Sequence, residues 1–299
     1  MILLTGATGF LGSQLLIDLL DKNYEVVALK RSFSNTVRIR GVLEDKKLHL
    51  FDIDLGDSRE IFKMYSIGTI IHTATEYGRN ETPMYTIVEA NLLFPLRLAE
   101  LGISKGVKTF INTDTYFNKA KSSHSNLLNY SLSKKSLLFC LTKLTDKLKV
   151  INVILEHIYG PYDSETKFVE NMIQNIAVER VARVSLTKGC QKRDFIYMED
   201  VVSAYLTLVE YSQTQNFLLE TFELGTGQCT QIRDFCEKIK LLSNSPTTLA
   251  FGDIPYRTDE IMESRADISK LKRLGWSPTF KLTEGLEGIL NKYDCNFHD

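Results

Sequence analysis

Three glycines close to the N-terminus constrain what this chain can fold into. The string Gly6-Ala-Thr-Gly-Phe-Leu-Gly12 follows the apolar run 2–4 and opens a segment whose leucines recur at helical spacing. A strand, a tight turn and a helix in this order form a dinucleotide-binding unit, because unpaired N–H groups and the dipole at the helix N-terminus favour an anion. The sequence therefore predicts a cofactor pyrophosphate at the following residues of the turn: Gly6, Thr8, Gly9, Phe10, Leu11 and Gly12.

Strand-like and helix-like segments alternate through the first half of the chain. This pattern predicts an α/β fold with a doubly wound parallel sheet, the Rossmann type, covered by helices on both faces. The expected strands are 2–4, 25–29, 48–52, 69–72, 109–112 and 150–155, and the clearest expected helices are 83–105 and 131–147. We expect residues 1–160 to form an NAD(P)-binding domain. Residues 161–299 are expected to form mainly a smaller, mixed α/β substrate-binding lobe, with some segments returning to the first domain.

Composition narrows the partners and the compartment. The 299 residues carry a net charge of -1, which offers no general attraction to nucleic acid or to an anionic membrane. The five cysteines are scattered without a CxxC pair, which argues for reduced thiols and against a zinc site or a disulfide framework. No apolar run approaches the ~18 residues of a membrane span, and no signal peptide precedes the first strand. A cytoplasmic protein is expected.

The end of the second expected strand bears on the choice of cofactor. An acidic residue there would bind the 2′-hydroxyl of NAD, whereas a basic residue suits the 2′-phosphate of NADP. The string Leu29-Lys30-Arg31-Ser32 has no carboxylate, so NADP is preferred and NAD is the less favoured alternative. Asp54 and Leu55, further along the chain, are placed to meet the adenine.

Tyr130 and Lys134 lie four residues apart on an expected helix, so they project from one face. A neighbouring ammonium group would lower the pKa of a tyrosine from about 10 by favouring phenolate. Lys134 would supply that charge and could also bind the nicotinamide ribose. Thr113, leaving the fifth strand, would hydrogen-bond the reacting oxygen. These three residues are the predicted catalytic group, and Tyr130 and Lys134 are also predicted to contact the cofactor.

Together these motifs resemble the extended short-chain dehydrogenases/reductases that act on nucleotide sugars, and the resemblance runs essentially end to end. Further strings that carry it are Ile71-His-Thr73-Ala74, Asn91, Ile158-Tyr-Gly-Pro161, Arg193-Asp-Phe-Ile-Tyr-Met-Glu-Asp-Val201, Leu224-Gly-Thr-Gly227 and Leu274-Gly-Trp-Ser-Pro278. The resemblance implies cofactor contacts at Thr73, Ala74, Thr75 and Asn91. It also implies that Arg193 and Arg257 bind the nucleotide diphosphate, a task that suits the fork of a guanidinium group.

Three longer strings are similar to the CDP-abequose synthases and, less closely, to the CDP-paratose synthases of this family. They are Thr75-Glu76-Tyr77-Gly78, Asn112-Thr113-Asp114-Thr115-Tyr116-Phe117, and Leu155-Glu156-His157-Ile158-Tyr159-Gly160-Pro161 with Lys167-Phe168 following. This resemblance implies that the substrate contacts are Glu76, Tyr77, Thr113, Asp114, Thr115, His157, Lys167, Phe168, Arg193 and Arg257. It also implies reduction of CDP-4-keto-3,6-dideoxyglucose for bacterial O-antigen, a part of lipopolysaccharide.

Three positions depart from the general family pattern. Ile154 and His157 stand where an arginine and an asparagine are common, so His157 is open to either a ligand-binding or a structural role. Thr115 stands where related 4,6-dehydratases have a catalytic glutamate, which disfavours dehydration.

The sequence favours an NADPH-dependent 4-ketoreductase and leaves alternatives. These are a CDP-paratose synthase or another reductase of a nucleotide-linked 4-keto-6-deoxyhexose, a nucleotide-sugar 4-epimerase, and an NADP-sensing regulator without catalysis. The segments 83–105 and 131–147 could pair across a homodimer or simply cover the sheet.

Overall fold

The computed structural model describes residues 1–79, 81–119 and 127–295, without the side chains of the last two residues. The chain divides into two compact units. The first comprises residues 1–155 and 202–222, and the second comprises residues 156–201 and 223–299. The boundary expected from the sequence lies after residue 160, whereas the structure divides the chain after residue 155. The segment 202–222 returns to the first unit.

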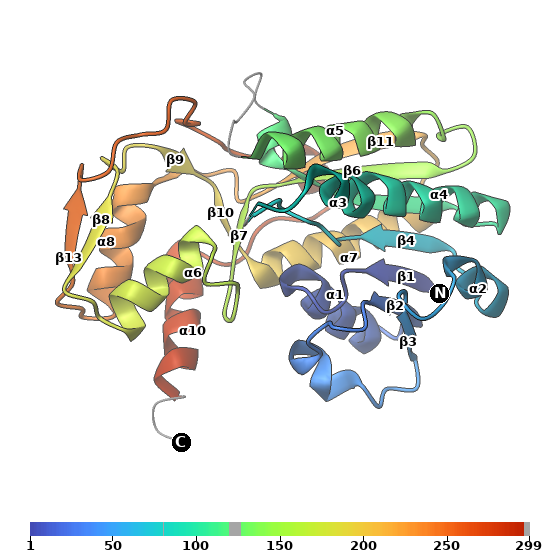
Figure 1. Cartoon of the computed structure of the whole chain (residues 1–299), viewed down its shortest axis with the longest axis horizontal. Coiled ribbons are helices and arrows are strands. Elements are labelled where there is room, and N and C mark those ends of the chain that lie inside the picture. Colours follow the sequence, from blue (N-terminus) through green and yellow to red (C-terminus); the bar gives the residue numbers. More distant parts are fainter. Residues whose placement is uncertain (80, 120–126, 296–299) are drawn as a thin grey trace. The chain divides into compact units, whose positions relative to one another are not determined.

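A seven-stranded sheet forms the centre of the first unit (Figure 1). Its strands, in chain order, are β1 (Ile2–Thr5), β2 (Val26–Lys30), β3 (Leu48–Asp52), β4 (Thr69–His72), β5 (Thr109–Thr115), β6 (Lys149–Leu155) and β11 (Leu219–Leu224). The order across the sheet is β11-β6-β5-β4-β1-β2-β3, and the pairs from β6 to β3 are parallel. The predicted Rossmann fold is confirmed.

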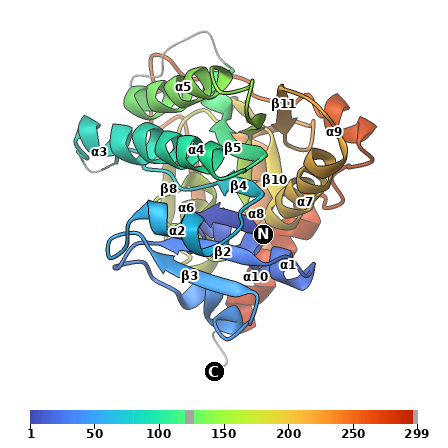
Figure 2. The same cartoon turned by 90° about the vertical axis from the view of Figure 1, so that its right-hand side faces the viewer.

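Helices cover this sheet, and α4 and α5 lie side by side over it (Figure 2). The helical segments of the unit are α1 (Phe10–Asp21), a 3-10 segment (Val37–Val42), α2 (Ser58–Met64), α3 (Met84–Val88), a π-helical turn (Glu89–Leu93), α4 (Phe94–Ser104), a 3-10 turn (Tyr116–Asn118), α5 (Leu128–Thr142) and α7 (Met198–Thr214), of which residues 202–214 belong here. Alternate buried residues of the strands, such as Leu3, Ile70 and Phe110, pack against Leu98 of α4 and Leu137 of α5.

Two helices differ from the sequence-based expectation. The helix expected over 83–105 is interrupted by the π-helical turn 89–93. The helix expected over 131–147 begins earlier and ends at Thr142, because the chain must turn back to enter β6 at Lys149.

The strand order reverses between β1 and β4. From β1 the chain proceeds to β2 and β3 on one side, and from β4 it proceeds to β5 and β6 on the other. Ligands of such sheets bind where this reversal occurs, beyond the carboxyl ends of the strands. The predicted turn 6–12 follows β1, and the predicted residues 73–77 follow β4, so both groups lie at this point.

The second unit contains three small strand pairs and four α-helices among its described residues. The parallel pairs are β7 (His157–Tyr159) with β10 (Phe195–Tyr197) and β8 (Arg183–Leu186) with β13 (Thr248–Phe251), and the antiparallel pair is β9 (Lys192–Arg193) with β12 (Thr230–Gln231). The helical segments are α6 (Phe168–Ile173), a π-helical turn (Gln174–Val178), α8 (Ile232–Leu242), α9 (Ser269–Arg273) and α10 (Leu282–Cys295).

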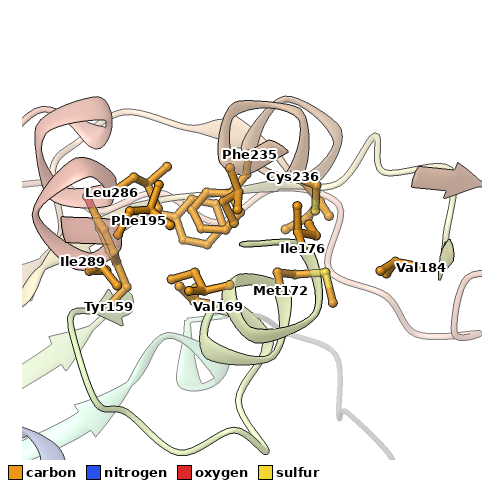
Figure 3. Packing of buried hydrophobic residues seen from close by; sticks show 14 of the residues in the cluster. Tyr159, Val169, Met172, Ile176, Val184, Phe195, Phe235, Cys236, Leu286 and Ile289 are labelled. Atoms are coloured by element: carbon orange, nitrogen blue, oxygen red, sulfur yellow. The ribbon is translucent and has the colours of Figure 1, made fainter. Parts of the chain in front are cut away.

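Aromatic packing forms the core of this unit (Figure 3). The rings of Phe195 and Phe235 stack with centroids 4.1 Å apart, and Tyr159 and Leu286 are buried in the same cluster. Phe195 begins β10 two residues after Arg193, the last residue of β9, so this core holds the chain next to a predicted diphosphate ligand.

Within the described ranges, no helix has both the length and the apolar character needed to cross a membrane.

Candidate active site

The glycine turn after β1 is built by close backbone contacts. Gly6 adopts a positive φ of 69°, and its carbonyl oxygen accepts a hydrogen bond of 2.9 Å from the backbone N–H of Gly9, which precedes α1. A Cβ at position 12 would lie 2.0 Å from the Gly6 oxygen. Only glycine at position 12 lets the first turn of α1 pack this closely on the end of β1. Phe10 and Leu11 begin the helix, and the N-terminal end of a helix favours an anion.

A cavity of about 1280 Å³ opens at the carboxyl ends of β1, β2 and β3. It contains the following predicted cofactor residues: Gly6, Thr8, Lys30, Arg31, Asp54, Ala74 and Thr75. Leu55 is 84% exposed, and it is not among the described residues that line the cavity. Sequence reasoning missed Phe33, Ser34 and Arg59, which line it as well.

The cations at the end of β2 are paired with carboxylates from the end of β3. Lys30 Nζ lies 2.7 Å from Asp52, and Arg31 Nε lies 2.5 Å from Asp54 Oδ1. The hydrogen bond from Lys30 lowers the pKa of Asp52, so this carboxylate stays ionised at neutral pH. The basic pair is therefore held in place at the cavity wall, with Arg31 still about half exposed.

Hydrogen bonds join the ends of β1 and β4. Thr5 Oγ1 lies 2.8 Å from His72 Nδ1 and accepts a hydrogen bond of 3.2 Å from the backbone N–H of Ala74. Thr73 Oγ1 donates to the carbonyl oxygen of Thr5 at 2.7 Å. Burial lowers the pKa of His72 well below its usual value, so this imidazole is neutral. Thr73 thus joins the two strands, and Ala74 and Thr75 face the cavity.

Asn91 lies in the π-helical turn, where its side chain is fully buried. Its Oδ1 accepts from Thr75 Oγ1 at 3.3 Å and from the Glu76 N–H at 2.8 Å. Its Nδ2 donates to the Glu76 carbonyl at 2.8 Å and to Ser133 Oγ at 3.0 Å. Two donors and two acceptors are all that a carboxamide has. Protein groups thus occupy the whole Asn91 amide, which positions the loop after β4 against α5.

The structure brings the three predicted catalytic residues together. Lys134 Nζ donates a hydrogen bond of 3.0 Å to the carbonyl oxygen of Thr113, and both residues lie with Tyr130 at the end of β5 and the start of α5. Thr115 hydrogen-bonds the Tyr130 hydroxyl. The Tyr77 ring packs on Tyr130 with centroids 5.1 Å apart. The loop that carries Tyr77 also carries Thr75 and Glu76, which line the cavity.

The protonation states of this cluster follow from burial. Tyr130 is 5% exposed, and burial, with Tyr77 next, raises its pKa well above the usual value. Burial lowers the pKa of Lys134 from 10.5 to about 8, against the opposing effect of Asp114. The sequence predicts that Lys134 lowers the pKa of Tyr130, whereas in the structure this pKa is raised. Lys134 donates its hydrogen bond to Thr113, and the desolvation of the phenolate dominates. At neutral pH Tyr130 holds its proton.

Asp114 is buried, and both of its carboxylate oxygens are occupied. Oδ1 accepts from the Thr115 N–H at 2.8 Å and from Asn118 at 2.6 Å, and Oδ2 accepts from Asn152 at 3.0 Å. Asn152 also accepts a hydrogen bond from Asn112. Asp114 therefore ties β5 to β6 and to the turn after β5.

A tyrosine from the segment 202–222 contacts Thr113, one of the predicted catalytic residues. Tyr205 on α7 places its hydroxyl 2.6 Å from Thr113 Oγ1. The local sequence does not predict this contact, because an apolar-periodic aromatic residue on an amphipathic helix indicates a core residue.

The second unit holds the remaining predicted substrate residues. Arg193 is buried, pairs with Glu260 and donates to the carbonyl oxygen of Ile261. His157 packs edge-on against Phe195, and burial and then Arg193 lower its pKa to about 3.

The other three predicted substrate residues of this unit are less buried. Lys167 Nζ lies 2.9 Å from Asp163. Phe168 begins α6 and is 37% exposed, and Arg257 is exposed. A diphosphate bound by Arg193 would have to share this guanidinium group with Glu260.

Comparison with known proteins gives three kinds of similarity. The model of the NAD dependent epimerase/dehydratase family matches residues 2–219. The chain is 34% identical to a CDP-abequose synthase of Salmonella muenchen and 32% identical to one of Salmonella typhimurium, over 97% of both chains in each case. The crystal structure of a UDP-glucuronic acid 4-epimerase from Bacillus cereus, in complex with UDP-glucuronic acid and NAD, superimposes with a TM-score of 0.83 at 23% identity and covers 99% of each chain.

Proposed function

Because this chain belongs to the NAD-dependent epimerase/dehydratase family of extended short-chain dehydrogenases/reductases, we propose that it reduces the C4 ketone of a nucleotide-linked deoxyhexose with NADPH. The specific reaction we propose is the conversion of CDP-4-keto-3,6-dideoxyglucose into CDP-abequose. The two curated relatives with 34% and 32% identity carry that name, CDP-abequose synthase.

The observation that carries the proposal is that Tyr130, in the cluster with Thr113 and Lys134, is buried and protonated. Reduction of a ketone consumes a proton at the carbonyl oxygen, and a buried Tyr130 with a raised pKa holds such a proton at neutral pH. A dehydratase needs a further acid and base for water loss. Position 115 is a threonine, and the oxygens of Asp114 are already hydrogen-bonded, which supports reduction over dehydration.

Each residue of the cluster has a separate task in this mechanism. Tyr130 donates its proton to the oxygen that becomes the C4 hydroxyl. Thr113 hydrogen-bonds the same oxygen as negative charge develops, when such a contact contributes most. Lys134 holds the Thr113 backbone in place and contacts the cofactor ribose. The nicotinamide cofactor, when bound, supplies the hydride.

We propose NADPH as the reductant because the end of β2 offers two cations and no carboxylate of its own. Lys30 and Arg31 line the cavity with Ser34 and Arg59, which together provide charge and hydroxyl donors for a 2′-phosphate. The pyrophosphate would bind at the turn from Gly6 to Gly12.

The substrate contacts that we propose in the first unit are Glu76, Tyr77, Thr113, Asp114 and Thr115. In the second unit we propose His157, Lys167, Phe168, Arg193 and Arg257. The guanidinium group of Arg193 now donates to the carbonyl oxygens of Lys192 and Ile261 and to the carboxylate of Glu260, so a bound diphosphate would have to compete with these acceptors.

A homodimer is also proposed. Large apolar side chains are exposed along neighbouring helices: Met84 of α3 is 52% exposed, and Leu132 and Phe139 of α5 are 44% and 65% exposed. A second copy that covers this face would remove that apolar surface from water. A molar mass of one chain by light scattering at micromolar concentration would contradict this part of the proposal.

The test is proton NMR of the product formed from CDP-4-keto-3,6-dideoxyglucose and NADPH. An axial C4 hydroxyl, read from the couplings of H4, supports CDP-abequose, and an equatorial one indicates CDP-paratose. No consumption of NADPH and no product from this ketone would contradict the proposed reduction.

Replacing Tyr130 with Phe is expected to lower kcat by at least about 100-fold and to leave NADPH binding within about twofold. The control is Tyr24→Phe, a partly exposed tyrosine just after α1 that does not line the cavity. Normal turnover in the Tyr130 variant would refute the assigned role.

A further inference from the structure

Tyr205 is a fully buried tyrosine that none of the sequence motifs includes. It lies on the part of α7 that belongs to the first unit, and its side chain is 0% exposed. Its hydroxyl lies 2.6 Å from Oγ1 of Thr113, and Thr113 is the one side-chain partner found for it among residues 1–79, 81–119 and 127–295. Thr113 itself is only partly buried.

The direction of this hydrogen bond follows from what each oxygen can do. Burial raises the pKa of the Tyr205 phenol well above its usual range, and the charge of Asp114 adds to the effect, so the phenol keeps its proton. If Thr113 donated, the Tyr205 proton would have no acceptor in a dry environment, at a cost of about 1–3 kcal/mol. Tyr205 therefore donates and Thr113 Oγ1 accepts.

This direction determines what Thr113 can offer a ligand. A hydroxyl group has a single proton, and an accepted bond on one side leaves that proton to point elsewhere. The Thr113 backbone is held as well, because its carbonyl oxygen accepts from Lys134 Nζ at 3.0 Å. The threonine is thus fixed by α5 through its backbone and by α7 through its side chain.

We propose that Tyr205 is a positioning residue of the active site, which donates to Thr113 Oγ1 and so directs the Thr113 proton toward the carbonyl oxygen of the substrate. The inference rests on the proposed function, because it takes Thr113 to contact that oxygen. No proton moves along the pair: Tyr130 supplies the proton that the product keeps, while Thr113 and Tyr205 retain theirs. Tyr205 also polarises the Thr113 hydroxyl, which strengthens its donation to a developing negative charge.

The kinetic test is a double-mutant cycle with Tyr205→Phe and Thr113→Ala. Tyr205→Phe keeps the ring and removes the donor, so we expect kcat to fall roughly tenfold with KM within about twofold. The kcat of Thr113→Ala should fall further, and the kcat of the double variant should be no lower than that of Thr113→Ala alone. Tyr211→Phe, on the same helix but packed on Phe217, is the matched control and should match the unaltered protein.

A merely structural Tyr205 would behave differently in this cycle. Its loss would then lower kcat in the Thr113→Ala background by the same factor as in the unaltered protein. That additive result, or a change confined to KM, would overturn the proposal. Equal thermal unfolding midpoints of the four proteins would show that the comparison is made between folded chains.

A second measurement needs no substrate and separates this inference from the proposed function. With tyrosine labelled by carbon-13 at Cζ, the signal lost in Tyr205→Phe identifies Tyr205. We expect that signal to stay constant from pH 7 to about 11 and to shift in Thr113→Val, which removes the acceptor. An unshifted signal would refute the contact. A protein that reduces no nucleotide-linked ketone would refute the proposed function, whatever the labelled tyrosine shows.

Discussion

Replacing Lys134 with Met is expected to stabilise the protein while removing its activity. The Lys134 side chain is 1% exposed, and its pKa falls from 10.5 to about 8. At about 1.4 kcal/mol per pKa unit, this shift means that the buried ammonium destabilises the fold by about 3 kcal/mol at neutral pH. The substitution also leaves the Thr113 carbonyl oxygen without its donor, which costs about 1–2 kcal/mol. The expected net gain in the free energy of unfolding is about 1–2 kcal/mol.

The gain depends on pH in a defined direction. The pKa of Lys134 is lower in the folded state than in the unfolded state, so between about pH 8 and 10.5 the unfolded chain binds more protons. Stability of the unaltered protein therefore rises with pH across this window. The advantage of the Met variant is complete below pH 8 and is lost as the pH approaches 10.5.

The assay is urea unfolding of the two proteins between pH 6 and 10.5, with Lys135→Met as the control. Lys135 is the next residue of α5 and is exposed, so its loss should leave the pH dependence unchanged. A Lys134 variant that is less stable at pH 7, or whose advantage does not vary with pH, would refute the reasoning that desolvation of the ammonium dominates.

Two further predictions concern the proposed cofactor site. Gly12→Ala should lower the free energy of unfolding by about 3 kcal/mol and abolish NADPH binding, because the new Cβ would lie 2.0 Å from the Gly6 carbonyl oxygen. The control is Gly41→Ala, which should be neutral because no atom lies within 4 Å of the added Cβ. Equal unfolding midpoints of the two variants in urea would contradict the prediction. Arg31→Ala should raise the Kd of NADPH at least about tenfold and that of NADH by less than about twofold in fluorescence titrations, and equal weakening of both cofactors would argue against a 2′-phosphate at this position.

Much of the sheet was predictable because its determinants are local. Apolar runs flanked by turn residues gave β3 and β4 with their observed bounds and the other four expected strands to within a few residues. The glycine turn was predictable for the same reason, since a tight turn between a strand and a helix has a sequence signature. The order and spacing of Thr113, Tyr130 and Lys134 along the chain were likewise sufficient to predict that these residues form one cluster.

Contacts between distant segments could not be read from local patterns. Nothing near Asn91 indicates that its amide joins the loop after β4 to Ser133, and nothing near Tyr205 indicates its bond to Thr113. The direction of the Tyr130 pKa shift was missed for a related reason. Spacing reveals a nearby lysine, but burial of the phenol, which dominates here, depends on how many other segments pack around it.

The order in which the chain leaves the ribosome gives the discontinuous first unit a particular vulnerability. Its first 155 residues are synthesised before the segment 202–222 that adds β11 beside β6 and supplies Tyr205. Until that segment emerges, β6 is an open edge strand, which can pair with other chains. A fragment that ends at Leu155 would keep this edge open and would lack the hydroxyl that orients Thr113. Synthesis must therefore pass through part of the second unit before the first unit can complete its sheet.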